Sequence, residues 1–243
     1  KIEKGDIYQL GEHRLMCGDC TIKENVDKLM NGQKADMVFT DPPYGIVIVN
    51  SSPRLQETKK LGSIGGSVMA NVGHYSPVIG DDTTDTARKH HQLIKGYSSN
   101  FIYFGGNYFT DFLPPSRGWI IWDKRNGDTT FADAELAWTS FDKSVRLYSF
   151  LWSGMRREGS REIEGKLRWH PTQKPVGLIM DILKDWGNSK SIIDCFGGSG
   201  STLIACEQTK RKCFMCEIDE YYCSVIIERW EKLTGKQAIK LNN

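Results

Sequence analysis

Three absences narrow the classes to which this chain can belong. No run of about 18 apolar residues occurs, so the sequence predicts no membrane-spanning helix and no membrane partner. Neither sign of charge dominates, since 32 Lys and Arg stand against 30 Asp and Glu, for a formal net charge of +2. Any contact with nucleic acid must therefore use a local basic patch. Repeats and low-complexity tracts are also lacking, and the length predicts a single domain over residues 1–243.

The sequence also lacks the pattern of a disulfide framework, because its seven cysteines are an odd number. Cys195, Cys206 and Cys223 lie in apolar surroundings typical of buried free thiols. The pairs Cys17-x-x-Cys20 and Cys213-x-x-Cys216 have the spacing of zinc ligands, but both overlap predicted strand ends. We therefore expect no metal site, and a reducing, cytoplasmic compartment.

The stretch Asp41-Pro42-Pro43-Tyr44 carries the most chemical information. It follows the apolar run 35–40, which is typical of a buried parallel strand. The two prolines stiffen the turn and leave its carbonyls free to accept hydrogen bonds. Asp41 and the Pro42 carbonyl can each accept a hydrogen from an amino group, and Tyr44 offers a face to a planar ring. This combination fits the exocyclic amine of an extruded nucleobase.

A second motif lies between Ser191 and Thr202, where an apolar strand runs into a glycine-rich turn. A helical pattern follows over 202–207, and a second strand over 213–216 ends at Glu217. This order is the layout of a Rossmann-like nucleotide site, in which the acid reaches a pair of ribose hydroxyls. A dinucleotide site would need glycine where Leu203 stands, so the pattern favours another nucleotide-type cofactor.

Together the two motifs resemble those of the amino-methylating DNA methyltransferases. There, Asp-Pro-Pro-Tyr addresses the target base and Asp-x-Phe-x-Gly-x-Gly holds S-adenosylmethionine. The catalytic motif at 41–44 precedes the cofactor motif at 194–200, which is the permuted order of the β class. The segments 170–175 (His-Pro-Thr-Gln-Lys-Pro) and 15–20 (Leu-Met-Cys-Gly-Asp-Cys) also match. The resemblance implies a Rossmann-like α/β fold, with a mostly parallel twisted sheet and helices on both faces.

The resemblance also implies roles for individual residues. The catalytic set is Asp41, Pro42, Pro43 and Tyr44. The cofactor-binding set is Asp19, Thr172, Lys174, Asp194, Phe196, Gly198, Gly200, Thr202, Glu217 and Ile218. For two of the cofactor-binding residues an alternative without a ligand remains open: Lys174 as an ordinary surface lysine, and Thr172 as the N-cap of a helix.

Two polar segments interrupt the pattern of alternating strands and helices. Residues 49–75 form a long insertion, which we interpret either as a lid over base or DNA or as a surface loop. Residues 154–169 carry five basic and three acidic side chains, and this interval holds the target-recognition region in the β class. We expect its arginines to contact DNA, with a solvated loop as the alternative. They are Arg156, Arg157, Arg161 and Arg168.

The alternation predicts a definite set of elements. Strands are expected over 7–10, 13–17, 35–40, 100–104, 118–124, 134–139, 145–152, 191–194 and 213–216. Helices are expected over 25–30, 83–93 and 202–207, and directly after Pro175.

The function predicted from these features is methyl transfer from S-adenosylmethionine to adenine N6 in double-stranded DNA, with the target base flipped out. Cytosine N4 is the close rival, and Asp rather than Ser at position 41 favours adenine by family resemblance. A different class is a zinc-stapled, non-catalytic DNA-binding module. The resemblance further implies a cytoplasmic, prokaryotic or phage-type protein of restriction–modification character. A homodimer and a partner nuclease stay open.

Overall fold

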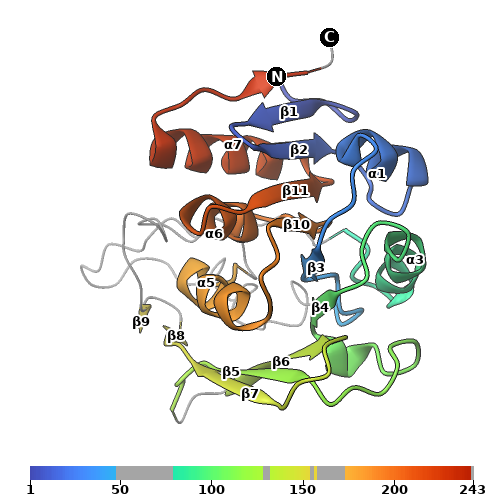
Figure 1. Cartoon of the computed structure of the whole chain (residues 1–243), viewed down its shortest axis with the longest axis vertical. Coiled ribbons are helices and arrows are strands. Elements are labelled where there is room, and N and C mark those ends of the chain that lie inside the picture. Colours follow the sequence, from blue (N-terminus) through green and yellow to red (C-terminus); the bar gives the residue numbers. More distant parts are fainter. Residues whose placement is uncertain (48–78, 128–131, 154–155, 158–172, 242–243) are drawn as a thin grey trace, which may run out of the picture.

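Figure 1 shows a computed structural model that describes residues 1–47, 79–127, 132–153, 156–157 and 173–241. Ten strands form one sheet, in the order β12-β1-β2-β11-β10-β3-β4-β6-β5-β7. The predicted insertion at 49–75 lies outside the described residues. Among those described, no helix has both the length and the apolar character needed to cross a membrane.

Five parallel strands form the centre of the sheet. In spatial order they are β2 (His13–Cys17), β11 (Lys212–Glu217), β10 (Ser191–Asp194), β3 (Met37–Thr40) and β4 (Phe101–Phe104). Every residue of β3 and β4 is buried, because layers of helices cover both faces of the sheet. All five strands therefore end at the same edge of the sheet, where a ligand of an open α/β sheet binds.

Antiparallel strands complete both margins of the sheet. On one side, β1 (Ile7–Leu10) pairs with β2 and with β12 (Ile239–Lys240), which confirms the predicted hairpin. On the other side, β6 (Ala134–Thr139) pairs with β4 and with β5 (Trp119–Asp123), and β7 (Arg146–Ser149) runs parallel to β5.

The single strand predicted over 145–152 is wrong. The chain leaves β7 after Ser149, and β8 (Trp152–Ser153) pairs instead with β9 (Arg156–Arg157) in a separate two-stranded sheet. The physical reason lies at Phe150, whose carbonyl accepts the indole N–H of Trp122 at 3.0 Å. The Trp122 side chain thus occupies the Phe150 carbonyl, which in a continuous strand would accept a backbone N–H of the neighbouring strand.

Helices cover the two faces in separate groups (Figure 1). On one face lie α1 (Lys23–Met30) and α3 (Asp85–Ile94), whose apolar residues share a core with Val38 and Ile193. On the other face lie α5 (Val176–Asp185), α6 (Ser201–Gln208) and α7 (Glu220–Thr234), packed against Leu15 and Ile192. A short 3₁₀ turn, η1 (Gly106–Tyr108), follows β4. These two layers confirm the predicted fold class.

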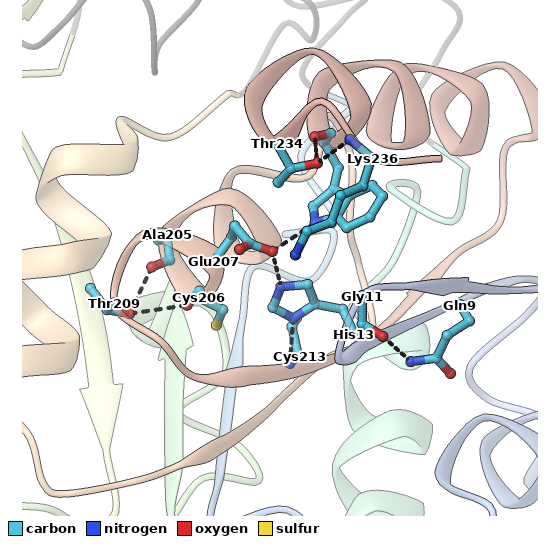
Figure 2. A network of polar contacts seen from close by, with 11 residues as sticks. Gln9, Gly11, His13, Ala205, Cys206, Glu207, Thr209, Cys213, Thr234 and Lys236 are labelled. Carbon is cyan, nitrogen blue, oxygen red and sulfur yellow. Dashed lines mark hydrogen bonds and ion pairs between the residues drawn. The ribbon is translucent and has the colours of Figure 1, made fainter. Parts of the chain in front are cut away.

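A polar network joins β2 and β11 to α6 and α7 (Figure 2). The backbone N–H of Cys213 donates to His13 Nδ1 at 3.0 Å, so the ring proton resides on Nε2. That Nε2–H donates to Glu207 Oε2 at 3.0 Å, and the indole N–H of Trp230 donates to the same oxygen at 2.8 Å. Burial lowers the pKa of His13, although Glu207 opposes the shift, and a neutral ring is the form that this network requires.

Candidate functional site

The two motifs singled out in the sequence meet at the shared edge of the sheet. β3 and β10 are parallel neighbours, with Ile192 opposite Met37 and Ile193 opposite Val38. The hydroxyl of Thr40, directly before Asp41, donates to Asp194 Oδ1 at 2.7 Å. A hydrogen bond between residues 154 positions apart thus connects the Asp-Pro-Pro-Tyr turn to the glycine-rich loop.

Both carboxylate oxygens of Asp41 have partners within the protein. The Tyr44 hydroxyl donates to Oδ1 at 2.5 Å, and Lys174 Nζ donates to Oδ2 at 2.6 Å. Burial raises the pKa of Asp41, and the positive charge of Lys174 opposes that rise. The side chain keeps 22% of its surface exposed. Asp41 therefore combines accessibility with a cationic partner that favours its ionised form.

An acid that the sequence analysis did not select, Glu135 on β6, completes a cluster of alternating charges. Its Oε2 lies 3.0 Å from Lys174 Nζ and its Oε1 lies 2.5 Å from Lys124 Nζ. Burial alone would raise the pKa of Glu135, but Lys174 and Lys124 together lower it to about 2. A carboxylate within the otherwise apolar run 134–139 was the signal available in the sequence.

The alternative interpretation of Lys174 as a surface lysine is wrong. Only 7% of its side chain is exposed, and its ammonium lies between Asp41 and Glu135. Burial disfavours its charge, yet the two carboxylates outweigh that effect and raise the pKa of Lys174. Lys124, Glu135, Lys174 and Asp41 together form a group with no net charge.

The ring of Tyr44 is held by aromatic neighbours and by one glycine. Tyr108 of η1 stacks on it with 5.0 Å between centroids and 15° between planes, and Phe109 meets it edge-on at 6.1 Å. At Gly105, where φ is +69°, a Cβ atom would lie 2.1 Å from the Tyr44 ring. Tyr108 was not selected from the sequence, and 42% of its surface is exposed. A planar ring entering here would meet Tyr44 and Tyr108 together.

Asp194 lies at the end of β10, where three donors address its carboxylate. They are the Thr40 hydroxyl, the Phe196 N–H at 3.1 Å and the hydroxyl of Thr202. Burial nevertheless raises the pKa of Asp194 to about 6. In the glycine-rich turn that follows Asp194, Gly200 has a φ of +81°, and a Cβ atom at Gly200 would lie 2.9 Å from Ile226. Glycine is therefore required at this turn for both backbone conformation and packing.

Glu217 lies at the end of β11, facing the same loop. Its Oε2 accepts the Gly198 N–H at 2.6 Å and its Oε1 accepts the Asp219 N–H at 2.8 Å. Burial raises the pKa of Glu217 to about 7. Each oxygen retains a second lone pair, so the carboxylate can accept two neighbouring hydroxyl groups while it stays anchored. These residues fit the ribose of a nucleoside cofactor.

The other residues predicted to bind the cofactor are Asp19, Phe196, Ile218 and Thr172, of which the structure describes the first three. Asp19 follows β2, where its Oδ1 accepts the backbone N–H and the hydroxyl of Thr21, each at 2.8 Å. Gly18 N–H donates to the Glu217 carbonyl at 2.9 Å, so the Asp19 turn lies beside the end of β11. Phe196 and Ile218 are half-buried at the same edge. Thr172 lies outside the described residues.

The predicted DNA-contacting arginines are only partly covered by the structure. The backbone of Arg156 and Arg157 forms β9, beside Trp152 and Ser153. Arg161 and Arg168 lie outside the described residues. Their proposed contact with DNA stays a prediction.

A four-cysteine zinc site does not form. All seven cysteines are buried and free. Cys17 and Cys213 belong to the core on one face of the sheet, whereas Cys20 and Cys216 belong to the core on the other. Because the sheet separates the members of each Cys-x-x-Cys pair, the zinc-stapled module loses its structural basis.

Solved structures of similar fold include one described as a DNA modification methylase and one described as a DNA methyltransferase. The M1.HpyAVI–SAM complex has a TM-score of 0.50 and 18% identity, covering 88% of this chain and 98% of its own. TTHA0409 from Thermus thermophilus, complexed with S-adenosyl-L-methionine, has a TM-score of 0.51 and 16% identity, with coverages of 92% and 96%. The cytosine-N4-specific PvuII DNA methyltransferase has a TM-score of 0.55 and 12% identity, with both chains covered to 98%.

Sequence comparison identifies the family. No curated protein sequence matches the chain. The profile described as DNA methylase, of the N6/N4 type, matches residues 35–228, which include the Asp-Pro-Pro-Tyr turn, the glycine-rich loop and Glu217. The chain therefore belongs to the N6/N4 family of DNA methyltransferases, whose methyl donor is S-adenosylmethionine.

Proposed function

We propose that this protein methylates the N6 amino group of adenine in double-stranded DNA. The observation that supports the proposal is the hydrogen bond from Thr40 to Asp194, which joins the residue before Asp41 to the start of the glycine-rich loop. An acceptor for an amino group and a nucleoside site thus share one edge of the sheet.

Asp41 would act by orienting the amino group. The lone pair of an aromatic amine is delocalised into its ring, which makes the nitrogen a poor nucleophile. If Asp41 and the Pro42 carbonyl accept the two amino hydrogens, the nitrogen moves toward tetrahedral geometry and its lone pair becomes localised. Each Asp41 oxygen already accepts one hydrogen bond, from the Tyr44 hydroxyl or the Lys174 ammonium, so the target amine would use a remaining lone pair or replace one of these partners. Much of the rate then comes from positioning.

Tyr44 and Tyr108 would receive the extruded base. The stacked pair lies at the turn that carries Asp41, and Tyr108 is substantially exposed. Stacking offsets part of the free energy lost when a base leaves the duplex. Pro43 keeps the turn rigid, so that Tyr44 and Asp41 address one base at the same time.

The cofactor would be held by the residues around the glycine-rich loop. S-adenosylmethionine supplies a methyl group that its sulfonium has already activated. Glu217 would accept the ribose hydroxyls, and Asp194, Lys174 and Thr172 would meet the amino and carboxylate groups of its methionine part. Phe196 and Ile218 would line the adenosyl pocket, with Asp19 near the adenine. Gly198, Gly200 and Thr202 would shape the loop.

Nucleoside analysis distinguishes adenine from cytosine as the target. DNA incubated with the protein and S-adenosylmethionine should yield N6-methyladenine on digestion and mass spectrometry. N4-methylcytosine instead would overturn the adenine assignment while leaving amino-methyl transfer intact. Asp41→Ala should form neither product, because it removes the acceptor for the amine.

A binding measurement controls for folding of the Asp41 variant. S-adenosylmethionine at about a hundred times its dissociation constant should stabilise either protein by roughly 2.7 kcal/mol. We expect this stabilisation to be almost equal for Asp41→Ala and the unaltered chain, since Asp41 addresses the base. A fully active Asp41→Ala variant would rule out the mechanism.

We also propose that the segment 154–169 contacts DNA. If its arginines neutralise phosphates, each contact should contribute about 0.9 to the slope of log affinity against log salt. The double variant Arg156→Ala with Arg157→Ala should then weaken binding to all duplexes and flatten that slope. If one arginine reads a base edge, its loss should cost about 1–3 kcal/mol at a single base position. Unchanged affinity and slope would make the segment a solvated loop.

A further inference from the structure

Three side chains with metal-binding chemistry meet beside the cofactor loop. They are Cys20 from the turn after β2, Cys195 from the end of β10, and His90 from α3. Each offers one ligand atom, and these atoms all lie within 4.8 Å of one another. Cys20, Cys195 and His90 are 4%, 2% and 0% exposed. The proposed methyl transfer gives none of them a role.

The two nitrogens of the His90 ring differ in their surroundings. Its Nδ1 lies 3.1 Å from the Tyr103 hydroxyl. Its Nε2 is fully buried and has no hydrogen-bonding partner among the described residues. Buried polar atoms without a partner are rare in folded proteins and require an explanation. Burial also lowers the pKa of His90 to about 3, so the ring is neutral at physiological pH and keeps a lone pair for a ligand.

The two thiols lie next to each other. The thiols of Cys20 and Cys195 are hydrogen-bonded to one another, and burial raises the pKa of Cys20 well above its ordinary value. Both therefore carry protons when no cation is present. A metal that binds here must displace two protons, which favours a soft or borderline ion with high affinity for thiolate.

We propose that Cys20, Cys195 and His90 bind one zinc ion. In the binding step, Zn²⁺ exchanges water ligands for two thiolate sulfurs and one imidazole nitrogen and keeps one water as its fourth ligand, while the two thiol protons leave to solvent. Two thiolates cancel the charge of Zn²⁺, whereas with Cu⁺ they would leave a net negative charge in a buried site. Magnesium and calcium prefer oxygen ligands, which this cluster lacks.

The geometry is compatible with zinc after a small contraction. Tetrahedral coordination with Zn–S bonds of about 2.3 Å places two sulfurs about 3.8 Å apart. The ligand atoms lie within 4.8 Å, so they need to approach by up to ~1 Å. With zinc on Nε2, the Nδ1–H would donate to the Tyr103 hydroxyl, which would then orient the ring. The ion would join the turn after β2, the end of β10 and α3.

Zinc titration of the reduced, metal-stripped full chain tests this site. In competition with a chromophoric chelator, the protein should take up one equivalent. Cys20→Ser and Cys195→Ser should each weaken binding by more than ~100-fold, and Tyr103→Phe, which removes only an outer contact, by about 10-fold. Cys206→Ser is the matched control, because Cys206 is equally buried but belongs to the core on the opposite face of the sheet. Its affinity for zinc should not change.

Cobalt provides a second readout that needs no variant to fold. Co²⁺ bound by the unaltered chain should show thiolate-to-cobalt charge-transfer absorption, which zinc should abolish on displacement. The proposal is overturned if the chain binds no stoichiometric zinc, or if Cys20→Ser and Cys195→Ser bind it as tightly as the unaltered chain. A Cys20–Cys195 disulfide in the freshly purified, reduced protein would overturn it as well.

Discussion

Lys174 Nζ lies 2.6 Å from Asp41 Oδ2 and joins the segment before α5 to the Asp-Pro-Pro-Tyr turn, 133 residues earlier. The same ammonium lies 3.0 Å from Glu135. In the free protein, Lys174 thus neutralises the acceptor that the proposed reaction needs. Lys174, which we expect to contact the cofactor, is therefore also a partner of Asp41, which we expect to contact the base.

Replacement of Lys174 by methionine should alter the pH dependence of methyl transfer. Burial already raises the pKa of Asp41, and Lys174 is the cation that opposes this rise. Without it the pKa of Asp41 rises further, so less of the carboxylate is ionised at a given pH. The acidic limb of the pH–rate profile should therefore shift to higher pH, and Lys174→Arg should partly restore it.

Lys124→Met is the matched control for this experiment, because Lys124 contacts Glu135 but not Asp41. The acidic limb of the pH–rate profile of Lys124→Met should stay near that of the unaltered protein. Lys174→Met should also lower the free energy of unfolding by about 2 kcal/mol, less than the ~3–5 kcal/mol of a fully buried pair, since the carboxylates are partly exposed. Equal shifts in both variants would show that Lys174 has no particular effect on Asp41.

Gly105→Ala should impair catalysis through Tyr44. Its methyl group would lie 2.1 Å from the Tyr44 ring, so the ring must move. A displacement of about 1 Å at a reacting group typically costs about 100-fold in rate, and we expect a loss of this order. Stabilisation by S-adenosylmethionine should persist, because Gly105 lies on the side of the base site.

Gly127→Ala isolates the steric effect from the backbone effect. Gly127 has a φ of +63°, close to the +69° of Gly105, but no atom lies within 4 Å of an added Cβ. Its rate should remain within a few-fold of normal. If the two variants lose activity equally, backbone strain rather than contact with Tyr44 is responsible.

The network around His13 should contribute measurably to stability. His13→Ala leaves the Cys213 N–H without its acceptor and removes one of the two donors to Glu207 Oε2, at a cost of about 1–3 kcal/mol. The urea midpoint should fall accordingly. Gln9→Ala, which removes an exposed bond to the Gly11 carbonyl (Figure 2), should change stability by less than about 0.5 kcal/mol. Similar midpoints for both variants would contradict the role given to His13.

The central strands and both motifs could be predicted from sequence because each apolar run ends directly at its polar turn. The family, the fold class and the cofactor were predicted from the same stretches and are confirmed. Glu135 and Tyr108 were missed because they reach the site through the antiparallel pairing of β6 with β4 and through η1. For Glu135 the one local signal was a carboxylate within the otherwise apolar run 134–139, whereas the contact made by Tyr108 leaves no local pattern. The same holds for His90, since a buried histidine on an amphipathic helix has no distinguishing spacing.

Cofactor affinity should depend on pH through Glu217. Burial raises its pKa to about 7 in the free protein, so below that pH the carboxyl is increasingly protonated. Two ribose hydroxyls are better accepted by the carboxylate, so binding should lower this pKa and release the proton. The dissociation constant should then rise as pH falls below about 7, approaching tenfold per pH unit for one linked proton.

Isothermal titration from pH 8 to pH 5 checks this linkage. Near pH 6 the dependence should steepen, because burial raises the pKa of Asp194 to about 6 and that group would also have to ionise. Glu217→Gln should bind the cofactor more weakly at pH 8. Its dissociation constant should lose the part of the pH dependence that lies near pH 7 and keep the part that lies near pH 6. Asp219→Asn is the control, since the Asp219 carboxylate caps α7: it should retain both parts, with the one near pH 7 moved to lower pH because the Asp219 charge also raises the pKa of Glu217. A pH-independent affinity in the unaltered protein would show that Glu217 is not the ribose acceptor.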